Sequence, residues 1–200
     1  AGSTILEAAH SVGIEIPTLC YLKEINAIGA CRICVVEVIG ARSLVAACVF
    51  PVNEGMEITI SSQKAIEARR TSVELLLSNH QRNCLQCDKA GNCELLEVAR
   101  VVGARDGKYL GELTDATLDE VAPGIVRNTA KCVLCGRCIE TCKQVQGIGV
   151  LGFEKRGFNT IVAPAENRSF AESPCIQCGQ CVLVCPTAAL MEKSEIARVD

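Results

Sequence analysis

The chain has 200 residues, 49% of them hydrophobic, and a formal net charge of −3 at pH 7. This is enough apolar material for one to three small domains. No apolar run reaches the roughly 20 residues of a membrane-spanning helix, and no signal-peptide pattern is present. We therefore expect a cytoplasmic protein. With mild negative charge and 3% aromatic residues, the chain lacks the basic stripe and base-stacking surface of a nucleic-acid-binding protein.

Residues 1–62 are predicted to form a small α+β domain. Ser3 or Thr4 can cap a short helix near the start. The runs Val35–Ile39 and Ser43–Val49 are rich in β-branched residues and predict a hairpin, and Met56–Ile60 alternates as a third strand.

Residues 63–120 and 121–200 are predicted as two further domains. Helices are expected over Gln63–Asn79 and from Asn92 to Gly103, on either side of a segment that carries His80 and three cysteines. Residues 104–130 are polar, contain Gly and Pro, and are expected to form a connector.

Both ends of the sequence look trimmed. The first residue is Ala1 rather than Met, next to a predicted helix, and Glu195–Asp200 is charged and has no obvious stop. We therefore expect the chain to begin inside a longer one, and the sequence leaves trimming at the far end open as well.

The fifteen cysteines decide the chemistry. Fifteen is odd, the cysteines fall into tight C-x2-C groups that suit disulfide geometry poorly, and a cytoplasmic protein is kept reduced. Metal binding is therefore the better interpretation.

The strongest signal is an internal repeat. Cys132–Cys142 and Cys175–Cys185 share the spacing C-x2-C-x2-C-x3-C, 43 residues apart, and Pro186 follows the second run whereas Lys143 follows the first. In two-cluster ferredoxins the fourth cysteine of each run binds the other cluster. We predict two 4Fe-4S clusters, and the alternative is a pair of four-cysteine zinc sites. The predicted ligands are Cys132, Cys135, Cys138 and Cys185 for one cluster, and Cys175, Cys178, Cys181 and Cys142 for the other.

The N-terminal cysteines have the spacing C-x10-C-x2-C-x13-C, which departs from the plant-type ferredoxin run. Three lie on a loop and its exit and the fourth on a predicted strand, so the four can converge on one 2Fe-2S cluster. Zinc or buried free thiols are the alternatives. The candidate ligands are Cys20, Cys31, Cys34 and Cys48.

The segment after the first long helix offers one imidazole and three thiolates in the order His-x3-Cys-x2-Cys-x5-Cys. Three cysteines leave a cluster one ligand short, and His80 can complete it. A neutral imidazole in place of a thiolate should raise the reduction potential of that cluster. Zinc held by the same groups is the alternative. The candidate 4Fe-4S ligands are His80, Cys84, Cys87 and Cys93.

One glycine motif is interpreted as a false positive for a nucleotide site. Residues 147–152 match G-x-G-x-x-G, but no hydrophobic strand precedes them and no βαβ unit surrounds them. Glycines that let the backbone pass close to a cluster are the better account.

The order of these motifs resembles the N-terminal electron-transfer region of iron-iron hydrogenases, above all the large subunit of NADH-linked multimeric ones. It is also similar to the matching part of the large iron-sulfur subunit of respiratory NADH dehydrogenase. The likeness covers the whole chain and includes both unusual ligand spacings. It is carried by Pro17–Cys20, Gly29–Val38, Leu77–His80, Gly91–Leu95, Val145–Gly147 and Cys178–Cys181.

The resemblance implies an α+β protein with three parts: a β-grasp 2Fe-2S ferredoxin domain, a small His-ligated 4Fe-4S domain and a bacterial two-4Fe-4S ferredoxin-like domain. It implies one 2Fe-2S and three 4Fe-4S clusters, as part of an oxidoreductase linked to NAD(P)H. No cysteine is left for a catalytic cluster, so no catalytic site is expected within residues 1–200. FMN and a further catalytic cluster are expected only on partners or outside this segment.

The expected role is an electron relay between an NAD(P)H-oxidising flavoprotein partner, or ferredoxin, and a hydrogenase-type catalytic site outside this segment. By resemblance, the partners are a flavoprotein NADH-oxidising subunit and a thioredoxin-like 2Fe-2S subunit, with ferredoxin as a further candidate. One alternative keeps the relay but serves a nickel-iron hydrogenase diaphorase, a formate dehydrogenase or a respiratory NADH dehydrogenase. An alternative of another class is a zinc-stapled scaffold with no redox role.

Overall fold

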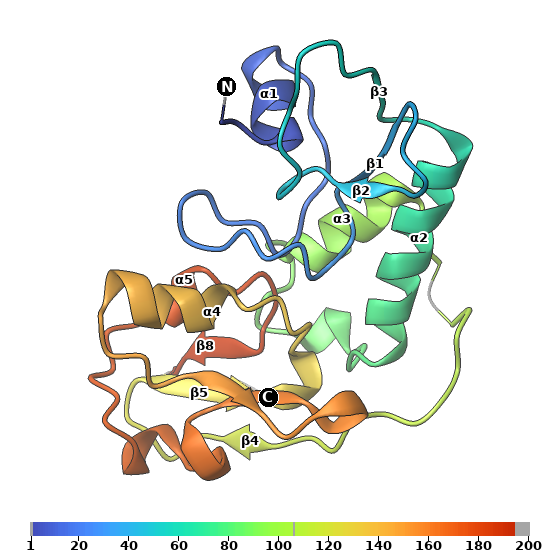
Figure 1. Ribbon diagram of the computed structural model, residues 1–200. Helices are drawn as coiled ribbons and strands as arrows, with labels where there is room; N and C mark the ends of the chain where they lie inside the picture. Colours follow the sequence, from blue (N-terminus) through green and yellow to red (C-terminus); the bar gives the residue numbers. More distant parts are fainter. Residues whose placement is uncertain (1, 106, 195–200) are drawn as a thin grey trace. The chain divides into compact units, whose positions relative to one another are not determined.

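The computed structural model of the chain describes residues 2–105 and 107–194 (Figure 1). The expectations about the two ends concern residues 1 and 195–200, which lie outside the described residues. Contacts divide the chain into two compact units, Ala1–Ser78 with Glu94–Gly111, and Asn79–Cys93 with Glu112–Asp200. The bounds of the three expected domains stay a prediction.

The first unit begins with the expected capped helix. In α1 (Ile5–Ser11) the Thr4 hydroxyl accepts a hydrogen bond from the amide of Glu7, and the Glu7 carboxylate accepts one from the amide of Thr4. This reciprocal pair satisfies two amides that a helix start leaves free. The predicted helix near the N-terminus is therefore confirmed.

A three-stranded antiparallel sheet forms the centre of the first unit, in the order β2-β1-β3. Its strands are β1 (Val35–Val38), β2 (Val45–Ala46) and β3 (Ile58–Thr59). The predicted hairpin and third strand are confirmed, although all three are shorter than expected. Val36, Val38 and Ala46 pack with Ile5 and Leu6 of α1 into one core.

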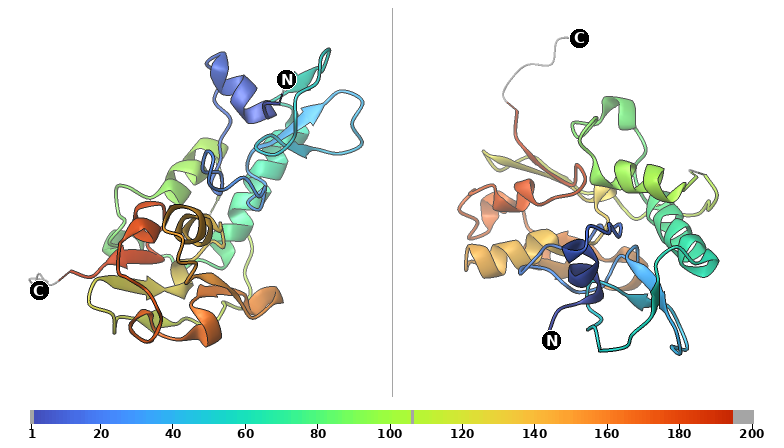
Figure 2. Two further views of the ribbon diagram at one scale, coloured as in Figure 1. Left: turned by 60° about the vertical axis from the view of Figure 1, so that its left-hand side comes forward. Right: turned by 90° about the horizontal axis from the view of Figure 1, so that it is seen from above.

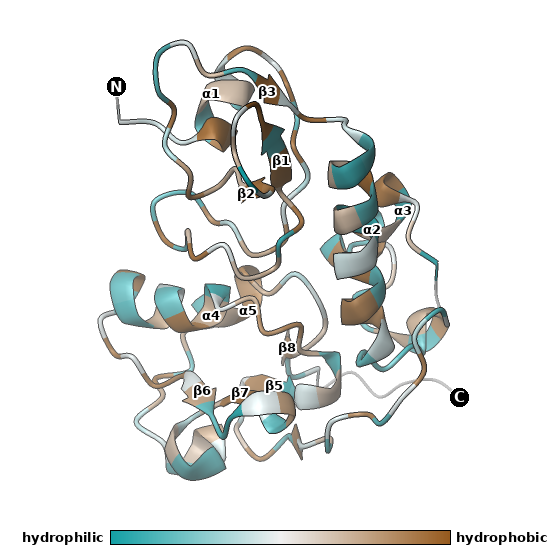
Figure 3. Ribbon diagram, turned by 45° about the vertical axis from the view of Figure 1, so that its right-hand side comes forward, coloured by the Kyte–Doolittle hydropathy of each residue, from teal (hydrophilic) through white to brown (hydrophobic). Residues whose placement is uncertain are grey.

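Two predicted helices complete the first unit and are also confirmed: α2 (Gln63–Ser78) and α3 (Glu94–Val102). They lie side by side in Figure 2, and α2 also packs on β1. Each helix carries both hydrophobic and hydrophilic segments in Figure 3. Apolar residues of α3 at helical spacing are buried, among them Leu95, Val98 and Val102, so packing stabilises this short helix.

The second unit has a three-stranded sheet in the order β4-β5-β8 and a separate hairpin of β6 and β7. Its strands are β4 (Leu118–Asp119), β5 (Ile125–Asn128), β6 (Gly152–Glu154), β7 (Ile161–Ala163) and β8 (Leu190–Glu192). Short helices α4 (Arg137–Glu140) and α5 (Gln180–Leu183) pack against each other, and α5 packs on β8 (Figure 1).

Single helical turns occupy much of the remaining backbone of this unit. Thr141–Val145 is a π-helical turn that continues α4. The 3₁₀ turns are Cys84–Gln86, Thr129–Lys131, Gly157–Asn159, Ala165–Asn167 and Phe170–Glu172.

The expectation of a connector over residues 104–130 was wrong for its second half. Residues of β4 and β5 lie in it, and β5 pairs with β8 more than sixty residues later in the chain. Ile125 and Arg127 are both buried. A buried arginine hid the alternation, because a strand pattern read from polarity counts arginine as exposed.

Candidate metal centres

The four N-terminal cysteines converge in the first unit. Cys34 directly precedes β1 and Cys48 follows β2, and the amide of Ala47 donates to the carbonyl of Cys34 at 3.2 Å. Cys20 is placed by the buried Asn26, whose Nδ2 donates to the Cys20 carbonyl at 2.7 Å. The hairpin therefore positions Cys34 and Cys48, and the preceding loop positions Cys20.

The sulfurs of this set lie within hydrogen-bonding reach of one another. Hydrogen bonds from the thiols of Cys31 and Cys48 lower the pKa of Cys20. The Cys48 thiol also contacts Cys34, lowers the pKa of Cys34 to about 7, and has its own pKa raised by these contacts. Three of the four residues are buried and Cys31 is half-buried. The structure thus brings together all four predicted residues of this set.

Glycine is required in the loop that carries Cys31. Gly29 has φ +62°, and a Cβ at this position would lie 3.4 Å from Cγ2 of Val49 and 3.7 Å from Cβ of Ala46. The backbone therefore passes close to the end of the hairpin in a conformation that other residues rarely adopt.

The His80 set is less closed. His80 is buried and its Nδ1 has no hydrogen-bond partner among the described residues, whereas Cys84 is exposed and Cys87 and Cys93 are half-buried. A buried imidazole nitrogen without a partner fits a metal ligand. Burial, with a smaller contribution from Lys131, lowers the pKa of His80 to about 4, so its imidazole is neutral at pH 7 and able to coordinate.

One backbone and one side-chain hydrogen bond hold this segment against the residues that precede Cys132. The amide of Gln81 donates to the carbonyl of Ala130 at 2.9 Å, and Nζ of the buried Lys131 donates to Oδ1 of Asn83 at 2.6 Å. These residues flank His80 and Cys84 on one side and Cys132 on the other.

Two apolar cavities, each with four cysteines in its wall, lie in the second unit. The first cavity has two cysteines on the loop before α4, one in α4 and one after α5. The second has one cysteine in the π-helical turn, two on the loop before α5 and one in α5. The first cavity is lined by Cys132, Cys135, Cys138 and Cys185, and the second by Cys142, Cys175, Cys178 and Cys181.

Each cavity therefore receives one cysteine from the other run. Cys185 reaches the first cavity because it follows α5, and α5 packs on α4. Cys142 reaches the second cavity from the π-helical turn after α4. A π-turn inside a helix is common at functional sites. The structure brings these residues together in the grouping that the sequence predicts for the ligands.

The backbone conformation repeats as the sequence does. Leu134 and Gln177 have φ of 52° and 57°, and Gly136 and Gly179, which begin α4 and α5, have φ of 77° and 75°. These turns aim amides at sulfur: the amide of Leu134 lies 3.4 Å from Sγ of Cys132, and the amide of Gln177 bonds Cys175.

The glycine motif at 147–152 lies beside the second cavity. Gly147 and Gly149 have positive φ, and the amide of Val150 donates to Sγ of Cys142 at 3.4 Å. Ile148 and Val150 line the cavity. Backbone that passes close to a cysteine sulfur agrees with the interpretation of these glycines.

Burial makes free thiolates unfavourable in both cavities. It raises the pKa of Cys132 and of Cys181 to about 12, and that of Cys138 well above its ordinary value. Iron would supply the positive charge that lets these sulfurs bind as thiolates. The donor set and the apolar lining fit an iron-sulfur cluster.

The cysteine groups do not have the geometry of a site for a single metal ion. Within residues 2–105 and 107–194, no three His, Cys, Asp or Glu side chains lie close enough to share one metal ion. Four ligands of a zinc ion would stand about 2.3 Å from one centre.

No helix in the described part of the chain has the length and apolar character needed to cross a bilayer.

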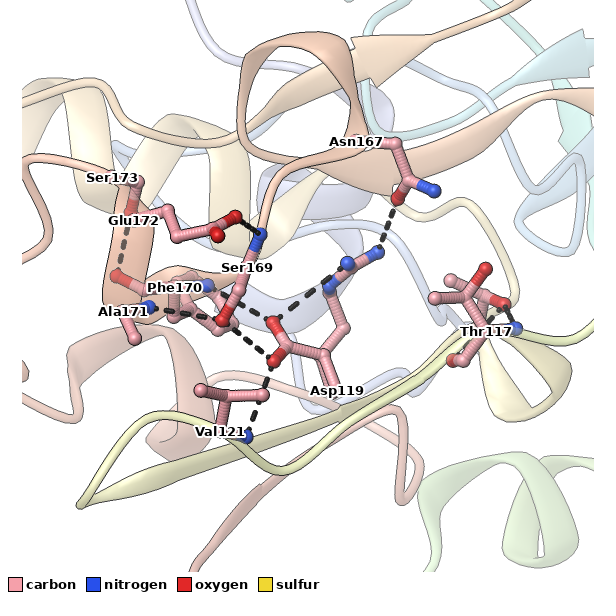
Figure 4. A network of polar contacts seen from close by, with 11 residues as sticks. Thr117, Asp119, Val121, Asn167, Ser169, Phe170, Ala171, Glu172 and Ser173 are labelled. Atoms are coloured by element: carbon pink, nitrogen blue, oxygen red, sulfur yellow. Dashed lines mark hydrogen bonds and ion pairs between the residues drawn. The ribbon is translucent and has the colours of Figure 1, made fainter.

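Sequence reasoning missed two charged residues beside the first cavity. Arg127 lines it from β5, and Asp119 of β4 lies 3.8 Å from the Arg127 guanidinium, with both side chains buried. Figure 4 shows the Asp119 carboxylate within a network that includes Asn167, Ser169 and Phe170. The only available signal was an arginine inside the short apolar run before Cys132.

Three family models match successive parts of the chain. They are a 2Fe-2S iron-sulfur cluster binding domain over residues 1–63, the NADH-ubiquinone oxidoreductase-G iron-sulfur binding region over 69–108, and a 4Fe-4S dicluster domain over 128–189. Both cluster types and mixed helix and strand content therefore agree with the sequence analysis.

Similar proteins are subunits of oxidoreductases. The NADP-reducing hydrogenase subunit HndD of Solidesulfovibrio fructosivorans is 44% identical over 203 residues, covering 99% of this chain and 35% of that protein. The G 2 subunit of the NADH-quinone oxidoreductase of Rhizobium meliloti (strain 1021) is 39% identical, covering 96% of this chain and 22% of that protein. The chain thus spans about a third or less of these relatives.

A solved structure supports the same relationship. One chain of the NAD+-reducing [NiFe]-hydrogenase in the H2-reduced state matches with a TM-score of 0.89 and 27% identity, over 99% of this chain and 84% of that chain. Together with the three family models, these matches show that the chain is homologous to the N-terminal iron-sulfur region shared by hydrogenase subunit HndD and the G-type subunits of NADH-quinone oxidoreductase.

Proposed function

We propose that this chain is an electron relay with one 2Fe-2S and three 4Fe-4S clusters, within an NAD(P)H-linked oxidoreductase of the iron-iron hydrogenase type. The observation that carries the proposal is the pair of apolar cavities, each with four cysteines in its wall and one of the four contributed by the other run. When bound, each cluster accepts and releases one electron with little movement of its ligands.

The proposed ligands follow the grouping of the side chains. The cysteines of the first cavity hold one 4Fe-4S cluster, those of the second cavity hold another, and the four converging N-terminal cysteines hold the 2Fe-2S cluster. His80 completes the third 4Fe-4S site with Cys84, Cys87 and Cys93, as supported by its buried, unpartnered Nδ1. The sheet and the single helix described within residues 1–62 are compatible with a β-grasp fold, and the corresponding division is 1–62, 63–120 and 121–200.

The protein's own residues bind and insulate the clusters. Most cysteines of the first cavity are buried, which limits the access of water, and amides of Leu134 and Val150 donate to the proposed ligand sulfurs. None of the fifteen cysteines, all of which lie in the described part of the chain, forms a disulfide. Such a set suits a reducing compartment, so we place the protein in the cytoplasm. No cysteine is left over for a catalytic cluster, so substrate chemistry takes place outside these residues.

The partners are proposed from the relatives. HndD is named as a subunit of an NADP-reducing hydrogenase, and the matched structure is an NAD+-reducing hydrogenase. We propose a flavoprotein NADH-oxidising subunit that carries FMN, a thioredoxin-like 2Fe-2S subunit and, as an additional donor or acceptor, ferredoxin. A hydrogenase-type catalytic cluster would lie elsewhere on the same polypeptide or on a partner.

A second candidate is the same relay with another terminus, a nickel-iron hydrogenase diaphorase or a respiratory NADH dehydrogenase. It is favoured by the TM-score of 0.89 to the [NiFe]-hydrogenase chain and by the 39% identity to the NADH-quinone oxidoreductase protein of Rhizobium meliloti. Isolation of the native complex distinguishes the candidates. The hydrogen-activating metal is iron alone in an iron-iron hydrogenase and nickel with iron in a nickel-iron hydrogenase, and a respiratory NADH dehydrogenase has no hydrogen-activating site.

The test of the relay is metal and sulfide analysis of anaerobically purified protein. One 2Fe-2S and three 4Fe-4S clusters contain about fourteen irons and as many sulfides. We expect this ratio, with broad visible absorption that bleaches on reduction. A colourless protein with stoichiometric zinc would instead identify a structural scaffold.

A further inference from the structure

The two cavities differ in charge although their sequences repeat. Arg127 lines the first cavity and Phe170 lines the second. Each stands five positions before the first cysteine of its run, Cys132 or Cys175. Among the described residues that line the second cavity none is charged, and Arg127 is the only charged one that lines the first.

The Arg127 side chain is fixed and desolvated. It is 2% exposed, and its Nη1 donates to Oδ1 of Asn167 at 3.0 Å. Its Nη2 lies 3.8 Å from Oδ2 of Asp119, which is longer than a hydrogen bond, and its buried Nε has no partner among the described residues. The guanidinium therefore keeps hydrogen-bonding capacity that the surrounding protein does not use.

Asp119 offsets this charge only in part, because other donors bind its carboxylate more closely. The Ser169 hydroxyl donates to Oδ1 at 2.9 Å and the amide of Phe170 donates to Oδ2 at 3.0 Å (Figure 4). The amide of Val121 adds a longer contact to Oδ1 at 3.4 Å. Asp119 is thus held by the segment that leads into the second cysteine run, while Arg127 faces the first cavity.

The positive charge of Arg127 would lie next to a cluster that accepts electrons. Reduction adds one negative charge to a cluster, and a buried positive charge nearby stabilises the reduced form more than it would in water. Charge near a cluster is one of the factors that set its reduction potential. An apolar phenylalanine in the corresponding place supplies no such stabilisation.

We infer that Arg127 selectively raises the reduction potential of the cluster in the first cavity, and that Asp119 moderates this effect. Arg127 is then a tuning residue, which acts through charge and binds no iron. The inference rests on the proposed function, since it requires clusters in both cavities. Arg127 and Asp119 are not ligands, yet this pair of buried charged residues gives the two clusters of the repeat different reduction potentials.

The experiment is an anaerobic redox titration of the full chain followed by electron paramagnetic resonance. The signals are assigned to the cavities beforehand with single cysteine variants of each. For Arg127→Met we expect a lower midpoint potential for the first-cavity cluster and an unchanged one for the second. Arg127→Lys keeps the charge and should restore most of the potential. Asp119→Asn should shift the same cluster upward.

Arg168→Met is the matched control, since it removes an exposed arginine that pairs with Glu166 and lines neither cavity, and both potentials should stay as in the parent protein. Equal shifts of both clusters in Arg127→Met, or no shift in Asp119→Asn, would overturn the inference. If the Arg127→Met protein does not assemble its clusters, the Asp119→Asn protein provides the test. A higher midpoint potential of the first-cavity cluster supports the inference, and a lower one overturns it. Iron and sulfide counts near those of the parent in these variants keep the proposed function intact, whereas a parent protein without clusters defeats the proposed function itself.

Discussion

Arg69 of α2 binds the main-chain carbonyl of Val35 twice, from Nε at 3.0 Å and from Nη2 at 2.8 Å. Arg69 is 7% exposed, and Val35 directly follows the candidate ligand Cys34. The long helix of the first unit thus fixes the strand that presents a cysteine. Hydrogen bonds from charged donors to a buried carbonyl are stronger than neutral ones.

We predict that Arg69→Met destabilises the 2Fe-2S site by about 2–3 kcal/mol, because it leaves the Val35 carbonyl buried without its donor. The measurement is the urea midpoint for loss of the visible circular dichroism of the cluster. Lys64→Met is the control: its ion pair with Glu37 is 3.8 Å long and exposed, so less than about 1 kcal/mol should be lost. Equal losses in the two variants would show that Arg69 does not anchor the strand.

The conformation of Gly29 gives a second prediction. Gly29→Ala should cost about 1–2 kcal/mol for the left-handed backbone, two residues before the candidate ligand Cys31, while its methyl group would meet Val49 and Ala46 at ordinary van der Waals distances. Gly40→Ala serves as the control, because Gly40 also has positive φ, at +85°, but nothing lies within 4 Å of its added Cβ. Faster loss of the 2Fe-2S spectrum in air for Gly29→Ala than for Gly40→Ala is the expected result. The reverse order would show that the conformation of Gly29 does not hold the loop that carries Cys31.

The local fold of the first unit could be predicted from sequence because each of its elements has a signal in its own residues. Thr4 with Glu7 forms a capping box, and the apolar residues of α3 recur at helical spacing. The strands of the second unit could not be predicted in the same way. The strand β5 finds its partner β8 only through tertiary pairing, with more than sixty residues between them in the chain.

The cysteines of the candidate site could be predicted from the sequence because ligand spacing is a local property. Their electrostatic surroundings could not be predicted, because they depend on contacts between distant parts of the chain. Asp119 and Arg127 are separated along the chain from Ser169 and Asn167, and no motif links them. Their role depends on burial, which a sequence reports poorly for charged residues. The geometry of the His80 set also depends on a contact, between Asn83 and Lys131, that only the fold provides.

His80 offers a prediction about potential. His80→Cys should keep a 4Fe-4S cluster and lower its midpoint potential, because a thiolate adds negative charge where the neutral imidazole adds none. Redox titration with electron paramagnetic resonance measures the shift. His10→Cys is the control, since His10 is exposed and pairs with Glu15 at 3.4 Å, far from any candidate ligand in sequence. A higher potential in His80→Cys would refute the electrostatic argument.

The exchange of cysteines between the two runs leads to the sharpest prediction. Cys142 belongs to the first run but lines the second cavity with Cys175, Cys178 and Cys181. Cys142→Ala should therefore damage the cluster held by the second run and spare the cluster held mainly by its own. The measurement is the loss of one set of low-temperature signals, with about four fewer irons per chain if that cluster is lost completely.

Cys185→Ala is the mirror variant, because Cys185 is the last cysteine of the second run but lines the first cavity. It should remove the signals that Cys142→Ala leaves intact, so the two variants together assign both clusters. If each substitution instead damages the cluster of its own run, the ligands do not cross, and the cavities would not correspond to cluster sites. Because the two variants remove the same chemical group from equivalent positions of the repeat, a difference between their spectra reports which cavity each cysteine serves.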